Sequence, residues 1–382
     1  MFSYDTLLLG LAVFSATIAA ASCSISRRPQ DDRNNRTRID AVANSNGTQA
    51  PGSDATTDNG STLPSGGGDF GGSEHGPASG SDATWSSGST ATTLVVPEQD
   101  GNIWRFTMGD TVAEIDTSIG ASIQTFAYRG VNVLAASSWF RPSPQARWGW
   151  PPPPEVESAP FTPSLQNNVV TFIGSVNRTW GLQASKRVWA DAADQTLNIE
   201  YTLTNRSSVV ASWAPWEISR VHPAGLTYFP EGTAINAKTN VLGMAQLPVT
   251  TLAGVTWLNQ QSAPLEPAKY IVARDGAEGW IAHVESGLVF IKSFADTSPD
   301  QLGPDEGEIQ LYTEAPATAD KFLEVEEEGP MVALPPGSST SWTVHWRLRP
   351  LPSHIAAAVG NAALVQWTRG VLGLGAAVQS SR

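Results

Sequence analysis

The feature of this sequence that most constrains its fold is a succession of short, alternating apolar runs between Thr93 and Pro352. Turn residues separate the runs, as in Arg274-Asp275-Gly276 and Pro335-Pro336-Gly337. Period-two alternation is typical of strands with one buried face, and strands without intervening helices form antiparallel sheets. We therefore predict that residues 93–352 form one all-β domain, a large antiparallel β-sandwich with one open face.

The sequence on either side of this domain has a different character. Residues 24–92 are rich in Gly, Ser and Thr and contain almost no large apolar side chain, which predicts a disordered linker. Residues 353–382 include His354–Leu372, where apolar residues recur at a four-residue step. This spacing predicts one terminal amphipathic helix followed by a short tail.

Residues 1–23 are typical of an export signal. The apolar run Leu7–Ala21 is shorter than the roughly 20 residues of a spanning helix, and it ends in small residues. Ala20-Ala21-Ser22-Cys23 resembles the lipobox of bacterial lipoproteins, in which the cysteine is acylated. We expect an exported, lipid-anchored protein of the bacterial cell envelope, in the outer membrane or periplasm, that contacts the membrane only through this anchor. Simple cleavage and an uncleaved anchor are the alternatives.

Charge and cysteine content exclude several kinds of partner. The formal net charge of −13 argues against nucleic acid, which needs clustered Lys and Arg. Cys23 is the one cysteine of the chain, so no internal disulfide and no cysteine-based metal site is expected. The acidic loop 297–308 contains Asp300, Asp305, Glu306 and Glu308. It lacks the spacing of a calcium loop, so we expect no metal and no cofactor. The oligomeric state is left open.

Three segments of the predicted domain carry a resemblance to a known superfamily. They are Ala113–Leu134, Lys186–Val221 and Phe322–Trp346, and together they cover most of residues 113–346. Their order of strands and turns resembles the galactose mutarotase-like superfamily, and within it the DUF4380 group. The resemblance implies an antiparallel β-supersandwich whose concave face binds a saccharide.

The resemblance also implies positions for an acid and a base. Enzymes of the superfamily open and close a sugar ring with a glutamate base near the C-terminus and a histidine acid in mid-chain. Glu324 best matches the glutamate position. Side chains alternate along a strand, so Glu324 and Glu326 should share a face, where two neighbouring carboxylates would raise one pKa. A solvated acidic edge strand is the alternative.

The histidine position departs from the superfamily pattern. In its place this chain has Pro215-Trp216-Glu217. Glu217 would replace the imidazole only if apolar surroundings raised its pKa. His222 and His283 are the other candidate acids, although a lone histidine on an alternating strand is more often structural, and His345 between Val344 and Trp346 is a weaker candidate than either. The predicted catalytic residues are therefore Glu324 with Glu217 or His222.

A segment rich in proline and tryptophan is a second candidate for ligand binding. Residues 139–154 hold four aromatic rings and two arginines, and their prolines predict a stiff, projecting loop rather than a strand. Aromatic rings stack on the C–H faces of sugars, while charged groups bind the hydroxyls. The predicted sugar-binding residues are Trp148, Trp150, Arg141, Arg147, Arg187, Arg220 and Glu326. Alternation implies that Lys186 and Arg187 cannot both face the ligand, and a hydrophobic lid is the alternative for the loop.

The combined interpretation is an exported carbohydrate-binding protein of the mutarotase-like fold, which need not be catalytic. An aldose 1-epimerase-like isomerase that uses a glutamate base is the first alternative. A structural envelope lipoprotein that contacts other proteins is the second. Fold resemblance does not decide among them, because one fold hosts many activities.

Overall fold

The structure is a computed structural model that describes residues 93–233, 244–259, 266, 268–304, 306–314 and 321–375. The predicted signal with Cys23, the predicted linker 24–92 and Asp305 lie outside these residues. Within the described part of the chain, no helix is long and apolar enough to cross a bilayer.

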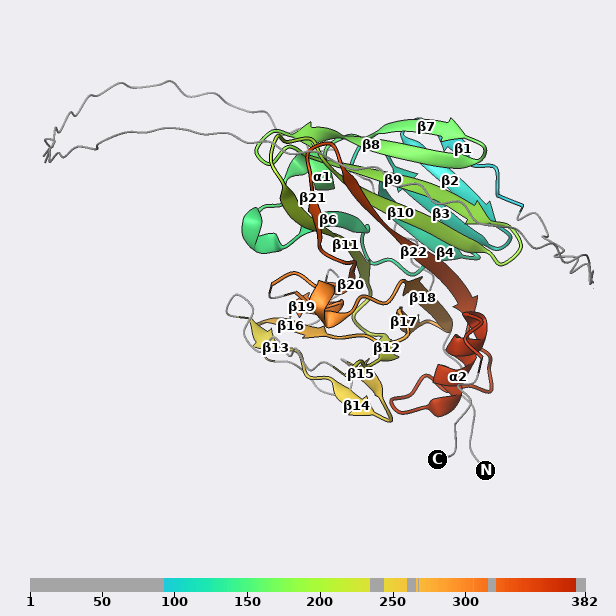
Figure 1. The fold of residues 1–382 in the computed structure, drawn as a ribbon. Coiled ribbons are helices and arrows are strands. Elements are labelled where there is room, and N and C mark those ends of the chain that lie inside the picture. The colour runs from blue at the N-terminus through green and yellow to red at the C-terminus, as the bar shows by residue number, and fades with distance from the viewer. Residues whose placement is uncertain are drawn as a thin grey trace, which may run out of the picture. The chain divides into compact units, whose positions relative to one another are not determined.

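The described residues form strands and two short α-helices (Figure 1). The strands are β1 (Glu98–Asp100), β2 (Ile103–Met108), β3 (Thr111–Asp116), β4 (Ser122–Tyr128), β5 (Val131–Asn132), β6 (Trp139–Ser143), β7 (Thr162–Gln166), β8 (Val169–Asn177), β9 (Leu182–Asp191), β10 (Thr196–Asn205), β11 (Ala211–Val221), β12 (Leu226–Pro230), β13 (Ala245–Gln246), β14 (Thr250–Leu252), β15 (Val255–Asn259), β16 (Lys269–Arg274), β17 (Trp280–Glu285), β18 (Leu288–Phe294), β19 (Ile309–Glu314), β20 (Leu323–Glu328), β21 (Val332–Leu334) and β22 (Ser339–Pro350). The helices are α1 (Pro154–Glu157) and α2 (Ala362–Val371).

These strands build three sheets. A ten-stranded sheet has the order β14-β15-β12-β17-β18-β22-β10-β9-β8-β7, and a five-stranded sheet has the order β1-β2-β3-β4-β5. A seven-stranded sheet has the order β13-β16-β19-β20-β11-β21, with β6 also paired to β11. Neighbouring strands are antiparallel except for the short parallel pair β13 and β16. The predicted fold class, an antiparallel all-β sandwich with a short C-terminal helix, is confirmed.

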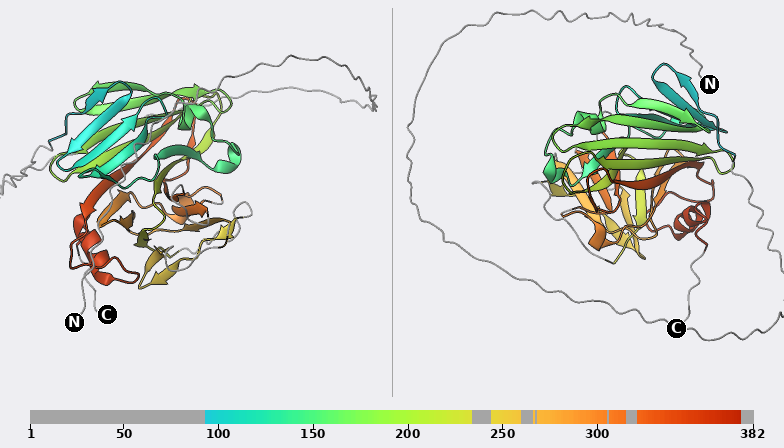
Figure 2. Two further views of the ribbon diagram at one scale, coloured as in Figure 1. Left: turned by 180° about the vertical axis from the view of Figure 1, so that it is seen from behind. Right: turned by 45° about the horizontal axis from the view of Figure 1, so that its top comes forward.

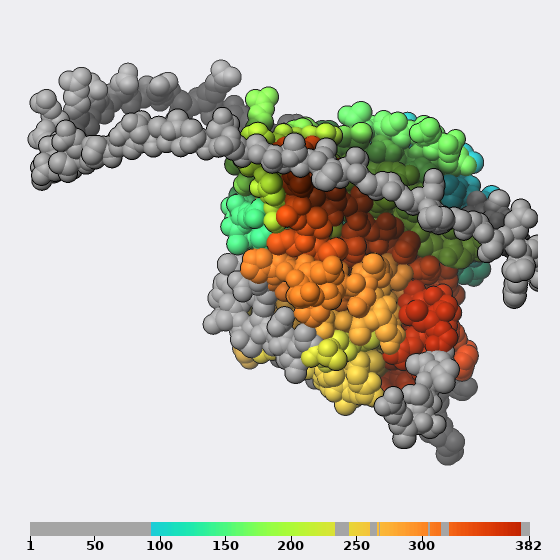
Figure 3. Space-filling model, viewed as in Figure 1, coloured from blue at the N-terminus to red at the C-terminus, as the bar shows by residue number. Residues whose placement is uncertain are grey.

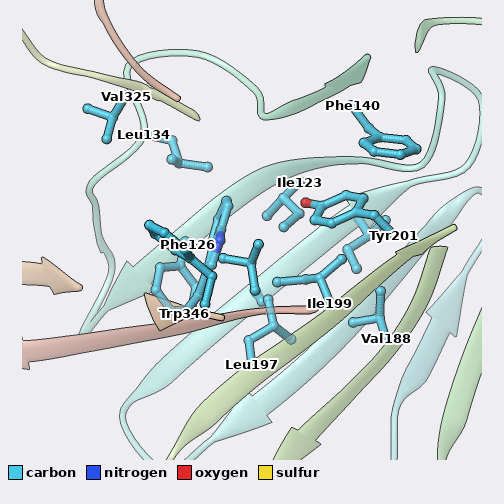
Figure 4. Packing of buried hydrophobic residues seen from close by; sticks show 14 of the residues in the cluster. Ile123, Phe126, Leu134, Phe140, Val188, Leu197, Ile199, Tyr201, Val325 and Trp346 are labelled. Atoms are coloured by element: carbon cyan, nitrogen blue, oxygen red, sulfur yellow. The ribbon is translucent and has the colours of Figure 1, made fainter. Parts of the chain in front are cut away.

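The ten-stranded sheet forms one layer, and the other two sheets pack against its inner face (Figure 2). Phe126 of β4 lies with its ring centroid 5.3 Å from that of Trp346 on β22, which joins the five-stranded sheet to the ten-stranded sheet. Phe140 of β6 stacks on Tyr201 of β10 at 4.6 Å, which joins the seven-stranded sheet to it (Figure 4). The buried side chains between the layers form one continuous apolar core.

Helix α2 covers part of the outer face of the ten-stranded sheet, where its red atoms lie against the yellow and orange strands (Figure 3). Leu364 of α2 is fully buried in a second apolar cluster that includes Trp257 and Trp280. Thr368 forms a 2.6 Å hydrogen bond with the hydroxyl of Tyr228 at the centre of this contact. The helix therefore docks by burial of one apolar stripe with a buried polar anchor.

The predicted helix 354–372 is wrong at its N-terminal end. Gly360 has a φ of +77°, which ends the preceding turn, and the Asn361 side chain accepts a 3.0 Å hydrogen bond from the backbone N–H of Ala363. This N-cap begins the helix at Ala362, because an asparagine oxygen satisfies a free N–H of the first turn. Ile355 still packs in the second apolar cluster, but from a non-helical segment.

The segment predicted as a projecting loop begins with a strand instead. Trp139–Ser143 is β6 and pairs with β11, with Pro142 directly opposite Pro215. Two facing residues that both lack an N–H leave no donor unpaired, so the pairing tolerates both prolines. The prediction of a loop is wrong for these five residues. The loop itself continues through residues 144–153.

Replacement of Leu364 by Ala tests the docking of α2. We expect a loss of about 3 kcal/mol in the free energy of unfolding, because the substitution leaves a cavity against the outer face of the sheet. Gln366→Ala, an exposed site on the same helix, is the matched control and should change stability little. Urea denaturation followed by tryptophan fluorescence measures both, and equal midpoints for the two variants would contradict this packing of the helix.

Candidate functional site

Strands β11 and β20 place a row of polar side chains on one face of the seven-stranded sheet. Their antiparallel register sets Arg220 opposite Glu324, Ile218 opposite Glu326 and Trp216 opposite Glu328. Directly opposite residues share a face, so these six side chains form one surface, which we call the glutamate face. Strand β20 lies between β19 and β11, and all six of its residues are buried. The alternative of a solvated edge strand for this segment is therefore wrong.

Glu324 is held by a forked contact with Arg220. The Arg220 Nε and Nη2 atoms lie 2.9 Å and 2.7 Å from the same carboxylate oxygen of Glu324. The guanidinium is itself flanked by rings, with its carbon 4.2 Å from the ring centroid of Phe322 and 5.8 Å from that of Trp139. Because the arginine is held on both sides, the Glu324 carboxylate has a defined position. The Arg220 side chain is 19% exposed, so this end of the face reaches the surface.

Glu326 lies beside Glu324 in a drier environment. The indole N–H of Trp216 donates a 2.9 Å hydrogen bond to Glu326 Oε2. Burial, and then the neighbouring charge of Glu324, raise the pKa of the Glu326 carboxyl well above its usual value. Strand alternation predicted one carboxyl with a raised pKa in this pair, and the raised pKa falls on Glu326. The pair thus combines an arginine-bound carboxylate with a neighbour that tends to keep its proton.

Arg141 connects the glutamate face to the proline-rich segment. Its Nε atom lies 2.6 Å from Oε1 of Glu157 on α1. Its guanidinium carbon is 5.7 Å from the ring centroid of Trp216 and 5.6 Å from that of Trp150. Trp150 is 71% exposed, whereas Arg141 is buried. The arginine therefore ties a solvent-exposed ring to the buried end of the site through two cation–π contacts.

Strand β19 adds two polar side chains that the sequence interpretation did not include. Gln310 is paired in register with Glu326, and Tyr312 with Glu324, so both belong to the glutamate face. The Tyr312 hydroxyl donates a 2.9 Å hydrogen bond to Glu314. The alternating pattern of β19 would have revealed these residues only together with its register against β20.

Glu217 lies on the opposite side of β11 from the glutamate face. It is paired in register with Glu327, and both carboxylates contact the ammonium of Lys292 inside the sandwich. Glu217 and Glu324 therefore do not face each other. His222, the residue after the end of β11, interacts electrostatically with His283 and Glu285 of β17.

The other predicted binding residues also lie apart from the glutamate face. Arg187 is exposed on the outer face of the ten-stranded sheet, where it pairs with Glu200 at 2.9 Å. Arg147 lies over the ring of Trp213 at 4.9 Å, and Trp148 donates a 2.7 Å hydrogen bond to the carbonyl of Pro142. Of the predicted set, the structure brings together Glu324, Glu326, Arg220, Arg141 and Trp150.

The acidic loop has a backbone-binding role at its buried end. Glu308 accepts hydrogen bonds from the backbone N–H groups of Gly276 and Thr297, at 2.9 Å and 2.6 Å. Burial raises the pKa of this carboxyl to about 7. Among the described residues, no group of three or more His, Cys, Asp or Glu side chains is arranged to hold a metal ion.

Lys186 points into the core, opposite in direction to exposed Arg187, as the alternation predicted. Its Nζ atom donates a 2.9 Å hydrogen bond to the carbonyl of Ala121 and lies between the rings of Phe161 and Tyr201. Burial lowers the pKa of this ammonium to about 7. Lys186 therefore contributes to the interior rather than to ligand contacts.

The chain is similar to one protein family and to several solved structures. A family model described as domain of unknown function (DUF4380) matches residues 139–349. No curated protein matches the sequence. A galactose mutarotase-like protein from Lactobacillus casei is 14% identical, with 65% of this chain and 100% of that chain covered, at a TM-score of 0.47. A galactose mutarotase-like protein from Clostridium acetobutylicum is 9% identical, with 68% and 99% covered, at 0.44. A TPR-domain containing protein from Parabacteroides distasonis is 12% identical, with 68% and 49% covered, at 0.48.

The lowered pKa of Lys186 predicts a pH-dependent contribution to stability. Folded Lys186 loses its proton near pH 7, while the unfolded side chain keeps it to about pH 10. Above pH 7 the unfolded state then binds more protons, so stability rises with pH. We expect the stability of wild type relative to Lys186→Met to increase by about 2 kcal/mol between about pH 7 and about pH 9. Chemical denaturation of both proteins at the two pH values measures this difference, and an unchanged difference would contradict the prediction.

Proposed function

The chain belongs to the DUF4380 family, and we propose that it is a carbohydrate-binding protein whose ligand lies on the glutamate face. One observation carries the proposal: a carboxylate held by an arginine, a second carboxyl and an indole ring meet on one face of a sheet. Sugar hydroxyls bind to such fixed charged groups, and the C–H face of a sugar ring packs on an aromatic ring. The resemblance of three sequence segments to the mutarotase-like superfamily supports the same ligand class.

The rigidity of the glutamate face further supports binding. Arg220 fixes Glu324, the indole of Trp216 fixes Glu326, and Arg141 is held between two rings. Groups that are already in place lose little conformational entropy when a ligand arrives. Trp150, exposed beside Arg141, provides a second ring at the edge of the face.

Two similar arginine–glutamate ion pairs, one in the site and one outside it, allow a direct test of this site. Glu324→Gln keeps the size of the side chain but removes its charge, so we expect sugar affinity to fall about ten- to a hundred-fold. Glu200→Gln breaks a similar arginine pair on the outer face of the ten-stranded sheet and should leave affinity unchanged. Isothermal titration calorimetry with a panel of aldohexoses measures both. If wild type binds no member of the panel, the proposal fails.

Aldose epimerase activity is a second candidate, favoured by the pairing of Glu324 with Glu326. Ring opening requires a base to take the proton of the anomeric hydroxyl and an acid to give a proton to the ring oxygen. Glu324, held by Arg220, suits the base, and Glu326, with its raised pKa, suits the acid. In this scheme Glu326 takes the role that a histidine has in the superfamily's enzymes.

The acid role of Glu326 predicts a particular pH profile. Anomer interconversion, followed by polarimetry or NMR, should exceed the buffer rate and decline as pH rises through the pKa of Glu326, because the protonated form is the donor. Glu326→Gln should lower the rate by about 100-fold or more while sugar binding persists. A wild-type rate no faster than buffer, with binding intact, would eliminate the enzyme and leave the binding protein.

The proposed location of this protein is the bacterial cell envelope, with a lipid anchor at Cys23. The support is the apolar run Leu7–Ala21 followed by small residues and the cysteine. Mass spectrometry of the mature N-terminus tests it, since a diacylated Cys23 and a simply cleaved chain differ in mass.

A further inference from the structure

A lysine from the ten-stranded sheet reaches the back of the two strands that carry the glutamate face. Lys292 lies in β18, directly after the four apolar residues Leu288–Ile291. It is 1% exposed and sits beside Trp346 of β22, with its Nζ atom 5.8 Å from the ring centroid. A buried ammonium is costly unless it is paired and its N–H groups are bonded. Lys292 must therefore have acceptors inside the sandwich.

The acceptors of Lys292 come from both strands of the site. Its ammonium contacts the carboxylate of Glu217 on β11 and that of Glu327 on β20. It also donates a 3.1 Å hydrogen bond to the carbonyl oxygen of Val325 on β20. An ammonium has three N–H donors, which equals the number of these contacts. The hydroxyl of Ser219 donates a further 2.8 Å hydrogen bond to Glu217, which fixes that carboxylate on its own strand.

These acceptors alternate with the residues of the glutamate face. Glu217 follows Trp216 along β11, and the Val325 carbonyl belongs to the peptide group that joins Val325 to Glu326. Val325 points into the interior with the other core residues (Figure 4). The Lys292 side chain, which comes from the opposite layer, thus contacts β11 and β20 on their core-facing side, next to Trp216 and Glu326.

The second buried lysine offers a contrast within the same layer. Lys186 is also buried, but its Nζ atom donates to the carbonyl of Ala121, in the turn just before β4, and makes no ion pair among those found in the described residues. Burial raises the pKa of Glu327 against the opposing charge of Lys292, and the charge of Glu217 raises it further. The Lys292 cluster is therefore a polar junction between layers, whereas Lys186 feels the charges of Glu217 and Glu157 only at a distance and donates its hydrogen bond elsewhere.

We propose that Lys292 is a positioning residue for the candidate site: by bridging Glu217, Glu327 and the Val325 carbonyl, it sets the placement of Trp216, Glu324 and Glu326. The ligand part of this inference rests on the proposed sugar-binding function. The geometric part does not, because the hydrogen bond between Trp216 and Glu326 exists without ligand.

The test uses a neutral replacement of the whole cluster in the full chain. Lys292→Met alone leaves two buried carboxylates without their cation and is expected to fold poorly. The triple variant Lys292→Met, Glu217→Gln, Glu327→Gln keeps the volumes and removes every charge, so it should fold cooperatively. Lys186→Met removes the other buried ammonium and is the matched control.

Two readouts separate positioning from general stability. The first is the indole N–H resonance of Trp216 in a ¹H–¹⁵N spectrum, assigned with Trp216→Phe, which reports its hydrogen bond to Glu326. The second is the dissociation constant for the aldohexose that wild type binds. We expect the folded triple variant to shift the Trp216 resonance and to bind about ten-fold more weakly, while Lys186→Met changes neither.

The Trp216 resonance tests the role of Lys292 independently of the proposed function. A folded triple variant with an unshifted Trp216 resonance and wild-type affinity would overturn the positioning role, even if the protein binds sugar well. A lower unfolding midpoint alone, without either change, would equally overturn it, because it would show a structural role only. If wild type binds no sugar, the proposed function fails, and the Trp216 resonance alone then supports or overturns the placement of the site by Lys292.

Discussion

Side-chain alternation along β11 and β20 is the constraint on which the rest of this structure depends. Each strand presents one set of residues to the core and the other to the glutamate face, and the antiparallel register brings the two sets together in pairs. The core set includes Glu217 and Glu327, and the opposite set includes Glu324 and Glu326. Both faces of these central strands are therefore polar as well as buried, which is unusual for the middle of a sheet.

Buried charge on both sides of a sheet is tolerable here because each group has a partner from a different element. On the glutamate face the partners are a guanidinium and an indole group from β11, and in the core the partner is one ammonium from β18. Removal of a single member would leave an uncompensated charge, so the groups are energetically interdependent. The site and the core thus share two strands and use opposite faces of them.

The sequence was sufficient for the fold class and for the face that neighbouring residues of one strand share. Alternation predicted the antiparallel all-β fold class, the family resemblance was confirmed by the DUF4380 match, and the shared face of Glu324 and Glu326 followed from their spacing. The sequence could not show that Glu217 and Glu324 lie on opposite faces of the sheet. Their arrangement depends on the register between strands about a hundred residues apart, which no local pattern encodes. Strand β6 was missed because Pro142 and the prolines after it suit a loop, and the strand pairing depends on Pro215 of β11, which faces Pro142.

The docking of α2 changes the burial pattern of the strands beneath it. In β17 and β18 nearly every residue is buried, because α2 covers one face and the core covers the other. In β9 and β22 of the same sheet, buried and accessible residues alternate, because their outer face meets water. The change from alternating to continuous burial therefore identifies the strands that the helix covers. In other chains of this architecture, the same change along the sequence would indicate which strands a helix covers.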